Sequence, residues 1–467
     1  MSEINKILEQ NIFKVISEVA EKNNTETYVI GGFVRDIFLQ RASKDIDILV
    51  IGKGIEFSLK VAKELGIKKV STFKNYGTSM FKYKGMDIEF VGARKESYHR
   101  ESRNPIVEDG TLDDDQKRRD FSINAMAFSL NKANYSELLD PFNGIKDLND
   151  KIIKTPLDPN ITFSDDPLRM LRAIRFATQL NFELDKAVFE AISSNKERIQ
   201  IISKERIIDE LNKILLSPYP SIGFNLLEET GLLNEFFPEL VKLKGTETIN
   251  GVSHKDNFYH TLEVVDNLAT KTDNLWLLWA GLLHDIGKPR SKRFNKKQGF
   301  TFHGHEVIGG RMVTDIFKKF KMPLNEKLSY VKKLVELHLR PIAIVKDVSD
   351  SAIRRLLFDA GNYIDDLMSL AESDITSKNE YKVQKFLNNF VIVRQKLIEI
   401  EEKDKIRNWQ PPISGEEIME YLKIQPSREV GIIKNSIKDA ILDGDIENSK
   451  EAAFKFMDKL ANKLGLK

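Results

Sequence analysis

The sequence has no cysteine among its 467 residues, and this absence excludes several kinds of chemistry at once. Disulfide bonds, thiolate zinc sites, iron–sulfur clusters and cysteine nucleophiles all require a thiol. Long apolar stretches are also missing, because the longest strongly apolar run, Leu275–Leu283, is far shorter than the roughly 20 residues of a membrane-spanning helix. The segment Met1–Asn24 mixes charges into a helical pattern and does not resemble a signal peptide. We therefore expect a cytoplasmic protein without a membrane partner.

The chain also lacks a large net charge. It has 72 Lys and Arg residues and 70 Asp and Glu residues, which gives a formal net charge of +2. The overall charge neither predicts nor excludes a nucleic-acid partner, which would need a local basic patch. Three segments are candidates for such a basic patch: Lys288–Lys297, residues 317–333 and the C-terminal stretch that ends at Lys467. Runs of basic residues are, however, more often solvent-exposed faces without a partner. The aromatic residues are mostly phenylalanine at helical spacing, which is typical of a core, so they predict no base-stacking platform.

Strand and helix signals alternate in the first third of the chain. The run Tyr28–Gly32 is β-rich and ends in two glycines before a helical pattern begins. Lys44–Gly52 alternates acidic and apolar residues and then becomes apolar, which predicts a strand with one polar face at its start. Thr78–Arg94 has the pattern of a hairpin with its turn at Lys84–Gly85. The acidic segment 95–117 lacks periodicity, and we predict a mobile loop there.

Beyond Pro156 the strand signals fade and most of the chain is helical. At roughly 150 residues per domain, the length suggests about three domains. A small α/β domain is thus followed by a long helical region, and the histidines gather in the middle of that region. We divide the chain into four predicted segments: residues 1–150, 151–244, 245–385 and 386–467.

Two aspartates, Asp45 and Asp47, lie two positions apart on a predicted strand, so both carboxylates leave the same face. The pair by itself fits a divalent-metal site, two surface charges, or turn and cap chemistry. Glu89, on the second strand of the predicted hairpin, would bring a third carboxylate beside the pair, and Asp87 on the same face is its rival.

A phosphate-binding turn is predicted beside these carboxylates. Gly31–Gly32 opens a helix, where free backbone N–H groups and the helix dipole favour phosphate, and Arg35 lies in its first turn. The turn lacks the GxGxxG dinucleotide fingerprint, and the chain has no Walker A loop. Three hard oxygen ligands next to a phosphate-binding turn are typical of Mg²⁺-assisted phosphoryl or nucleotidyl transfer.

Four short motifs follow one another in the first half of the chain: YVIGGFVRD…DID (Tyr28–Asp47), KRRDFSINAMAF (Lys117–Phe128), LDPFNGIKDL (Leu139–Leu148) and DDPLRMLRAIRF (Asp165–Phe176). In this order they resemble the class II tRNA nucleotidyltransferase and poly(A) polymerase family, within the DNA polymerase β-like superfamily. The resemblance covers roughly residues 25–220, and residues 418–448 resemble the family's C-terminal region more loosely. One position departs from the usual pattern, because Asp165 replaces a glutamate and is one carbon shorter.

The resemblance implies a role for each matching residue. Asp45 and Asp47 would hold Mg²⁺, and Glu89 would be the third catalytic carboxylate. The implied nucleotide-binding residues are Gly31, Gly32, Arg35 and Arg119 at the triphosphate, Asp120 and Asn124 at the sugar, Asp166 and Arg169 at the base edge, and Arg172 and Arg175 along the same helix face. A carboxylate and a guanidinium can match the Watson–Crick edges of C and A, so this helix would select bases without a nucleic-acid template.

Both arginine-rich motifs also have purely structural explanations. Without the family resemblance, the segment from Asp166 would be a capped helix with a solvated basic stripe, because its arginines recur every three residues. Arg118, Arg119 and Asp120 would likewise form a surface ion-pair cluster of little energetic value.

Histidines and aspartates in the helical region form a second constellation, at His260, His284, Asp285, His305, His338 and Asp374. Imidazole together with carboxylate suits a transition metal or Mg²⁺/Mn²⁺. The pattern, which includes LLHDIGKP, resembles the HD phosphohydrolase domain over about residues 254–380. By this resemblance all six residues would be metal ligands, with Mn²⁺ or Ni²⁺ as possible ions and His303 as a competitor of His305.

Together the two resemblances imply an α+β nucleotidyltransferase head of the polymerase β-like class (1–150), a helical neck with a nucleotide-recognition helix (151–244), an HD domain (245–385) and a helical, tRNA-binding tail (386–467). The implied function is addition of CCA to the 3′ end of tRNA from CTP and ATP, with HD-type phosphohydrolase activity in addition. Poly(A) polymerase, partial CC- or A-addition, and a phosphohydrolase with a non-catalytic RNA-binding module remain alternatives. The oligomeric state is left open.

Overall fold

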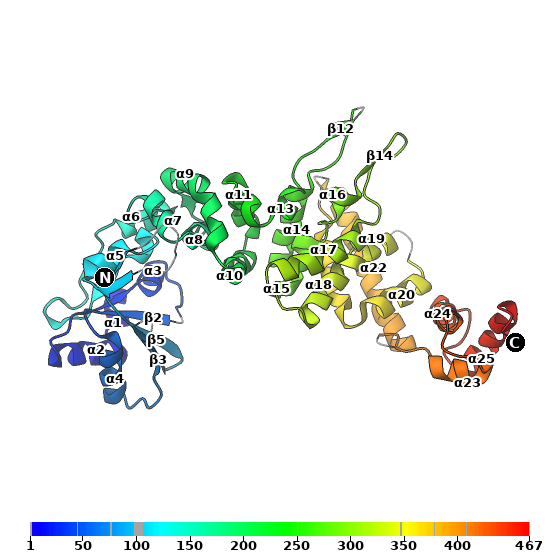
Figure 1. Ribbon diagram of the computed structural model, residues 1–467, viewed down its shortest axis with the longest axis horizontal. Coiled ribbons are helices and arrows are strands. Elements are labelled where there is room, and N and C mark those ends of the chain that lie inside the picture. Colours follow the sequence, from blue (N-terminus) through cyan, green and yellow to red (C-terminus); the bar gives the residue numbers. More distant parts are fainter. Residues whose placement is uncertain are drawn as a thin grey trace. The chain divides into compact units, whose positions relative to one another are not determined.

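The computed structural model describes residues 2–43, 45–74, 77–97, 106–249, 251–345, 348–377, 379–407 and 409–466. The chain divides into two compact units, Met1–Pro238 and Glu239–Lys467. A mixed sheet and helices make up the first unit, and the second is almost entirely helical (Figure 1). Within the described ranges, no helix is both long and apolar enough to cross a bilayer.

The first unit is built on a seven-stranded sheet with the order β3-β4-β5-β2-β1-β8-β9. Only β2 and β5 run parallel among its paired strands, and the other pairs are antiparallel. Its strands are β1 (Thr27–Ile30), β2 (Asp45–Val50), β3 (Ser71–Phe73), β4 (Thr78–Tyr83), β5 (Met86–Gly92), β8 (Ala127–Ser129) and β9 (Leu138–Leu139). Apolar residues in the middle of the sheet, such as Ile48 and Phe90, are fully buried.

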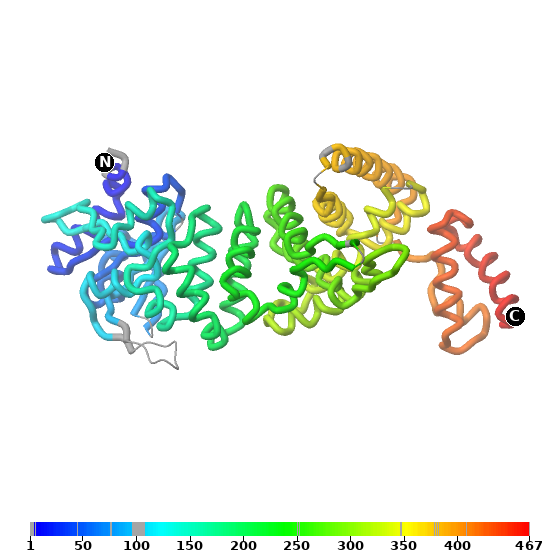
Figure 2. Tube along the Cα trace, turned by 90° about the horizontal axis from the view of Figure 1, so that it is seen from above, coloured from blue at the N-terminus to red at the C-terminus, as the bar shows by residue number. Residues whose placement is uncertain are grey.

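Helices cover the sheet and continue beyond it as a helical layer. Their bounds are α1 (Ser2–Leu8), α2 (Asn11–Lys22), α3 (Gly32–Phe38), α4 (Gly54–Glu64), α5 (Leu112–Lys117), α6 (Gly144–Asp150), α7 (Pro159–Asp165), α8 (Leu168–Leu180), α9 (Lys186–Asn195), α10 (Lys204–Leu215), α11 (Pro220–Glu229) and α12 (Leu232–Phe236). Helix α13 (Pro238–Val241) begins at the last residue of the first unit and otherwise belongs to the second. The short strands β10 (Ile152–Ile153) and β11 (Glu183–Leu184) pair in parallel. Helix α8 packs against both α10 and α11, and α9 packs against α7, in the blue-green to green part of the tube (Figure 2).

The predicted hairpin is confirmed, and its turn explains its register. Lys84 and Gly85 both have positive φ values, 48° and 85°, and Tyr83 pairs with Met86 across the turn. Such a two-residue turn matches the twist of the flanking strands. The hairpin therefore holds Glu89 at a defined position beside β2.

The mobile loop predicted for residues 95–117 is wrong for its described parts. Arg94–Ser97 (β6) pairs with Ile106–Asp109 (β7), and α5 follows. The helix begins there because the Thr111 side chain accepts the backbone N–H of Asp114, whose carboxylate accepts the backbone N–H of Thr111. Residues 98–105 of the predicted loop lie outside the described residues.

The second unit is a helical array with two small β-hairpins. Its helices are α14 (Asn257–Ala269), α15 (Leu275–Leu283), α16 (Lys288–Ser291), α17 (His305–Lys319), α18 (Glu326–Leu337), α19 (Leu339–Ile344), α20 (Asp350–Ala360), α21 (Ile364–Ser373), α22 (Glu380–Asp404), α23 (Gly415–Leu422), α24 (Arg428–Asp443) and α25 (Lys450–Lys463). One hairpin pairs β12 (Thr248–Ile249) with β13 (Val252–Ser253), and the other pairs β14 (Arg293–Asn295) with β15 (Gly299–Thr301).

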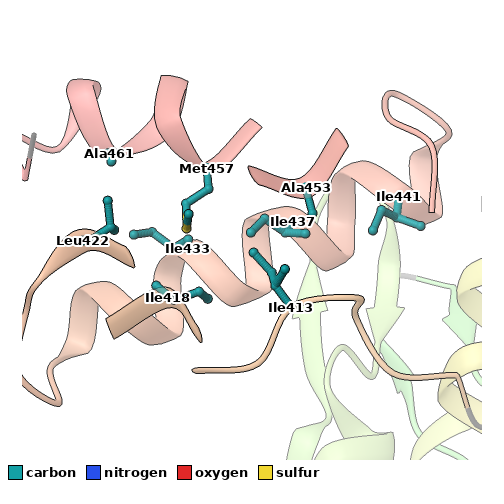
Figure 3. Packing of buried hydrophobic residues seen from close by; sticks show 9 residues of the cluster. All are labelled: Ile413, Ile418, Leu422, Ile433, Ile437, Ile441, Ala453, Met457 and Ala461. Carbon is teal, nitrogen blue, oxygen red and sulfur yellow. The ribbon is translucent and has the colours of Figure 1, made fainter. Parts of the chain in front are cut away.

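The last three helices have a hydrophobic core of their own. Ile418, Ile433, Ile437, Ala453 and Met457 are fully buried and face one another between α23, α24 and α25 (Figure 3). Arg355 on α20 forms ion pairs with Asp439 and Asp443 on α24 and so connects this core to the preceding helices. The four-segment division of the chain stays a prediction.

Two candidate active sites

The predicted acidic residues of the sheet lie on neighbouring parallel strands. Asp47 pairs in register with Glu89, and Asp45 pairs with Asp87. Asp87 also lies opposite Lys82, whose ammonium is 3.5 Å from its carboxylate, so a neighbour already balances its charge. We call Asp45, Asp47 and Glu89 the carboxylate face.

The carboxylate face has the electrostatics of a cation site. Burial raises the pKa of Glu89, and the charges of Asp47 and Asp45 raise it further. Burial likewise raises the pKa of Asp47; the Arg119 guanidinium lowers it, and Asp45 raises it. Ionised carboxylates only accept hydrogen bonds, and three of them on one face match the hard oxygen set that Mg²⁺ prefers.

Gly31 brings the glycine turn directly against this face. Its φ is 86°, and a Cβ at this position would lie 2.9 Å from Nη1 of Arg119 and 3.0 Å from Oδ2 of Asp47. Any other residue here would be strained and would collide with both charged groups. The absence of a side chain thus leaves the backbone of the turn next to the carboxylate face, with Arg35 one helical turn further on.

A buried carboxylate that the sequence analysis did not single out holds the two arginines of the second motif. Asp115 is fully buried, and it accepts hydrogen bonds from Nε of Arg118 at 2.8 Å and from Nε of Arg119 at 3.0 Å. The spacing of three and four residues in DDDQKRRD was the available signal. The surface ion-pair explanation for this motif is therefore wrong.

Asp120 connects the segment after α5 to α8. Its carboxylate accepts from Asn124 Nδ2 at 3.0 Å and from Arg172 Nε at 2.7 Å, while Asn124 Oδ1 accepts from Arg35 at 2.9 Å. Burial opposes ionisation, but the charge of Arg172 and the hydrogen bonds from Asn124 and Arg172 lower the pKa of Asp120 to about 2. The structure thus brings together four predicted nucleotide-binding residues, from α3, from the segment that leads into and includes the 3₁₀ turn at Ser122–Asn124, and from α8.

The two predicted base-reading residues lie at the start of α8, with Asp166 two residues before its first residue and Arg169 in its first turn. Asp166 Oδ1 accepts the backbone N–H of Leu168 at 3.1 Å, which caps the helix, and Arg206 of α10 lies 3.8 Å from its other oxygen. Arg169 donates to the backbone carbonyl of Arg118 at 2.7 Å. Arg169 therefore lies next to the motif that carries Arg119, whereas the contacts of Asp166 are with α8 and α10.

The solvated-stripe explanation for α8 is wrong. Arg175 is only 8% exposed and lies 3.2 Å from Glu210 of α10. Burial lowers the pKa of Arg175 to about 10, although Glu210 raises it. Arg35, Arg172 and Arg175 surround the ring of Phe176 at 5.1, 5.5 and 4.2 Å from its centroid. These arginines therefore belong to the interior of a polar network. Glu210 is a further member of this network that the sequence analysis did not identify.

The six residues of the second constellation converge in the helical unit. Asp285 Oδ1 lies 3.3 Å from His305 Nε2 and 3.9 Å from His338 Nε2, and its Oδ2 lies 3.3 Å from His284 Nε2. Asp374 approaches His260 and His284 at 2.8 and 3.5 Å. We call these six residues the histidine–aspartate cluster. The rival His303 is exposed and lies outside it.

The outer nitrogens of the rings are held in the way that metal-binding histidines require. Nδ1 of His284, His305 and His338 each lies 2.7 Å from a backbone carbonyl, so Nδ1 carries a proton and Nε2 faces the cluster. Nδ1 of His260 instead meets the hydroxyl of Thr376 at 2.8 Å, which also accepts from Lys255 at 2.6 Å. Sequence reasoning missed both of these supporting residues.

The charges of the cluster also fit a bound cation. Nε2 of His284 is buried without a hydrogen-bond partner among the described residues. Burial would lower the pKa of His284, but Asp285 and Asp374 raise it to about 10. Burial and the neighbouring charge of His284 lower the pKa of His338 to about 4. A positive charge is thus favoured between the two carboxylates, and a transition metal or Mn²⁺ bound by the imidazoles would supply it in place of the proton on His284.

Three segments of the chain match known protein families. Residues 27–154 match the Poly A polymerase head domain, residues 181–243 match the probable RNA and SrmB-binding site of polymerase A, and residues 257–365 match the HD domain. An A-adding tRNA nucleotidyltransferase of Deinococcus radiodurans is 31% identical over 352 residues, which cover 73% of this chain and 78% of that protein. The chain belongs to the tRNA nucleotidyltransferase family.

Members of the tRNA nucleotidyltransferase family are enzymes, so the predicted family and enzyme class are confirmed. A CC-adding tRNA nucleotidyltransferase of Thermus thermophilus is 28% identical over 91% of this chain and 92% of its own. A solved CCA-adding enzyme with ATP has 20% identity and a TM-score of 0.64, and covers 98% of this chain and 96% of its own. At this identity the likeness concerns the fold, and the predicted α+β head followed by helices is confirmed.

Proposed function

We propose that this tRNA nucleotidyltransferase adds C, C and A in turn to the 3′ end of tRNA, from CTP and ATP. The observation that carries the proposal is the carboxylate face beside the glycine turn at Gly31, with Arg35 and Arg119 next to it. This arrangement suits nucleotidyl transfer, in which the tRNA 3′-hydroxyl loses its proton and forms a bond to the α-phosphate while pyrophosphate leaves.

Each part of the site has a task in this reaction. Asp45, Asp47 and Glu89 would hold two Mg²⁺ ions, which would lower the pKa of the attacking hydroxyl and balance the charge on the leaving pyrophosphate. Arg35 and Arg119 would bind the triphosphate, because guanidinium groups donate in pairs to phosphate oxygens. The ordered pair Asp120 and Asn124 would position the sugar, and Arg172 and Arg175 would keep α8 in place.

We further propose that Asp166 and Arg169 select the base, and that the tail, residues 386–467, binds tRNA. Asp166→Asn keeps an acceptor for the backbone N–H of Leu168, so the helix cap survives while one acceptor becomes a donor. We expect the preference for CTP and ATP over UTP and GTP to fall roughly 5- to 150-fold, the equivalent of about 1–3 kcal/mol for a lost polar contact. Total incorporation should fall less than in variants of the carboxylate face.

The measurement is kcat/KM for each of the four nucleotides, with Arg169→Ala tested in parallel. Arg206→Lys is the control, because it keeps the charge near Asp166 on a side chain that is itself partly exposed. Strict addition of C, C and A by both variants would mean that the N-terminal turn of α8 serves the structure alone.

Partial addition and poly(A) synthesis are the alternatives to full CCA addition. Two of the relatives are named A-adding and CC-adding tRNA nucleotidyltransferases, so partial addition has to be tested. Purified protein is given three tRNAs, which end before the first C, after the first C and after the second C, with CTP, ATP or both. We expect all three to be completed to CCA, and sequencing of the product ends is the measurement. Addition of A to the third tRNA only, of C residues only, or of long A tails would replace the proposal with the corresponding alternative.

A second candidate activity is phosphohydrolysis at the histidine–aspartate cluster. It is favoured by the convergence of four imidazoles on Asp285, with Asp374 beside two of them. It is also favoured by Nε2 of His284, which is buried and has no hydrogen-bond partner among the described residues. A divalent ion bound there, such as Mn²⁺ or Ni²⁺, would make water nucleophilic near neutral pH and polarise a phosphoester. In the reaction the oxygen of water bonds to phosphorus, and the ester oxygen leaves with a proton.

A further inference from the structure

The segment that leads from the histidine–aspartate cluster into the β14–β15 hairpin has an unusual composition. Residues 288–303 contain four lysines, two arginines and three phenylalanines, but no aspartate or glutamate. The whole chain has a net charge of only +2, so this segment is a strong local concentration of positive charge. In Figure 1 the hairpin extends from the helical body on the same side as β12.

The aromatic rings of this region form a continuous row. Phe294 and Phe300 are cross-strand partners with centroids 5.1 Å apart, and Phe300 lies 4.9 Å from the ring of His254. His254 in turn lies 5.8 Å from Phe302. All four rings are partly exposed, so they are not the core of the helical unit. A cross-strand pair alone would stabilise the hairpin, but it would not require the row to continue past the hairpin.

The row ends at the histidine–aspartate cluster. The backbone carbonyl of Phe302 lies 2.7 Å from Nδ1 of His305 and sets the orientation of that ring. The ammonium of Lys288 lies 5.7 Å from the ring centroid of Phe302 and 2.5 Å from Asp285. Lys292 similarly lies 5.6 Å from the ring of Phe300. Cationic groups therefore accompany the rings from the hairpin to the cluster.

The geometry points to a binding track for the end of a single-stranded nucleic acid, formed by His254, Phe294, Phe300 and Phe302 with Lys288 and Lys292. This inference rests on the proposed phosphohydrolase activity and names its substrate class. Bases stack on exposed aromatic faces whatever their sequence, while lysines neutralise the phosphates between them. A small phosphate ester would bind at the cluster without touching the rings. A substrate with several bases would also stack those bases on the row of rings and so bind more tightly. The track would thus present a terminal phosphoester of an oligonucleotide to the cluster.

The test compares two substrates with the same reacting group on the full-length protein supplied with Mn²⁺. One is a single-stranded oligoribonucleotide that ends in a 2′,3′-cyclic phosphate, and the other is the corresponding mononucleotide. Phe300→Ala and Lys292→Ala should lower kcat/KM for the oligonucleotide by roughly 5- to 150-fold and leave that for the mononucleotide within about twofold. Phe300→Tyr keeps the ring and should retain activity, and Lys332→Ala on α18 is the charge-matched control.

A second measurement does not depend on hydrolysis. An oligoribonucleotide with 5-iodouridine near its 3′ end is photo-crosslinked to the full-length protein, and the modified peptides are identified by mass spectrometry. Crosslinks to residues 293–302 support the track even if neither substrate is hydrolysed, a result that would reject the phosphohydrolase proposal by itself. Crosslinks confined to other segments, or equal losses on both substrates in Phe300→Ala, would overturn the track.

Discussion

Asp45→Asn combined with Asp47→Asn is expected to lower nucleotide addition by at least about a thousandfold. Loss of a single group that stabilises transition-state charge costs roughly 100- to 1,000-fold, and this variant removes two carboxylates that would hold Mg²⁺. The metal-free variant should not melt at a lower temperature than the unmodified protein, because Asp45 and Asp47 repel each other and burial raises the pKa of Asp47. The measurements are single-turnover addition of CMP to tRNA and thermal unfolding followed by circular dichroism.

Matched substitutions on β5 make this test specific. Glu89→Gln should lose most of the activity, because Glu89 lies in register with Asp47. Asp87→Asn, two residues earlier on the same face, should keep most of it, because Asp87 interacts with Lys82. Near-normal addition by the folded double variant would reject the transferase site, and equal losses in Glu89→Gln and Asp87→Asn would reject the choice of Glu89.

His284→Ala combined with Asp285→Ala is expected to remove the metal from the helical unit. The metal content should fall from about one ion per chain to near zero. The variant removes the buried Nε2 of His284 and the carboxylate of Asp285, which approaches four imidazoles. Metal-dependent release of phosphate or opening of a 2′,3′-cyclic phosphate should disappear with it. Addition of CCA should continue, because its carboxylate face belongs to the other unit. Elemental analysis and the two activity assays are made on the same preparations.

His303→Ala is the matched control for this variant. It removes an imidazole two residues before His305, but that imidazole is exposed and lies outside the histidine–aspartate cluster. Metal content and hydrolysis should therefore persist. An unmodified protein that retains no metal, and hydrolyses neither substrate with Mn²⁺, Ni²⁺ or Mg²⁺, would contradict the proposed second activity. Loss of CCA addition in the double variant would mean that the two sites are coupled.

Features that depend on neighbouring residues could be predicted from the sequence. Side chains alternate along a strand, so the sequence places Asp45 and Asp47 on one face. Lys84–Gly85 between two strand patterns predicts a two-residue hairpin turn, and both residues have positive φ in the structure. The family resemblance came from four motifs in fixed order, which the comparisons bear out at the level of the family. The histidine–aspartate pattern likewise predicted a set of six residues that the structure brings together. In each case the information lies in residue type and spacing, which a linear sequence carries in full.

Only the tertiary structure decided which groups support these side chains. The choice between Glu89 and Asp87 depended on strand register and on Lys82 across the hairpin. The pairing of β6 with β7 was missed, because two short strands that are separated in the sequence show no shared local periodicity. Glu210, opposite Arg175, and Thr376, beside His260, lie on separate elements of their units. Such contacts depend on how elements far apart in the sequence pack together. Burial strengthens these hydrogen bonds and ion pairs, so that they fix the orientation of the side chains they join.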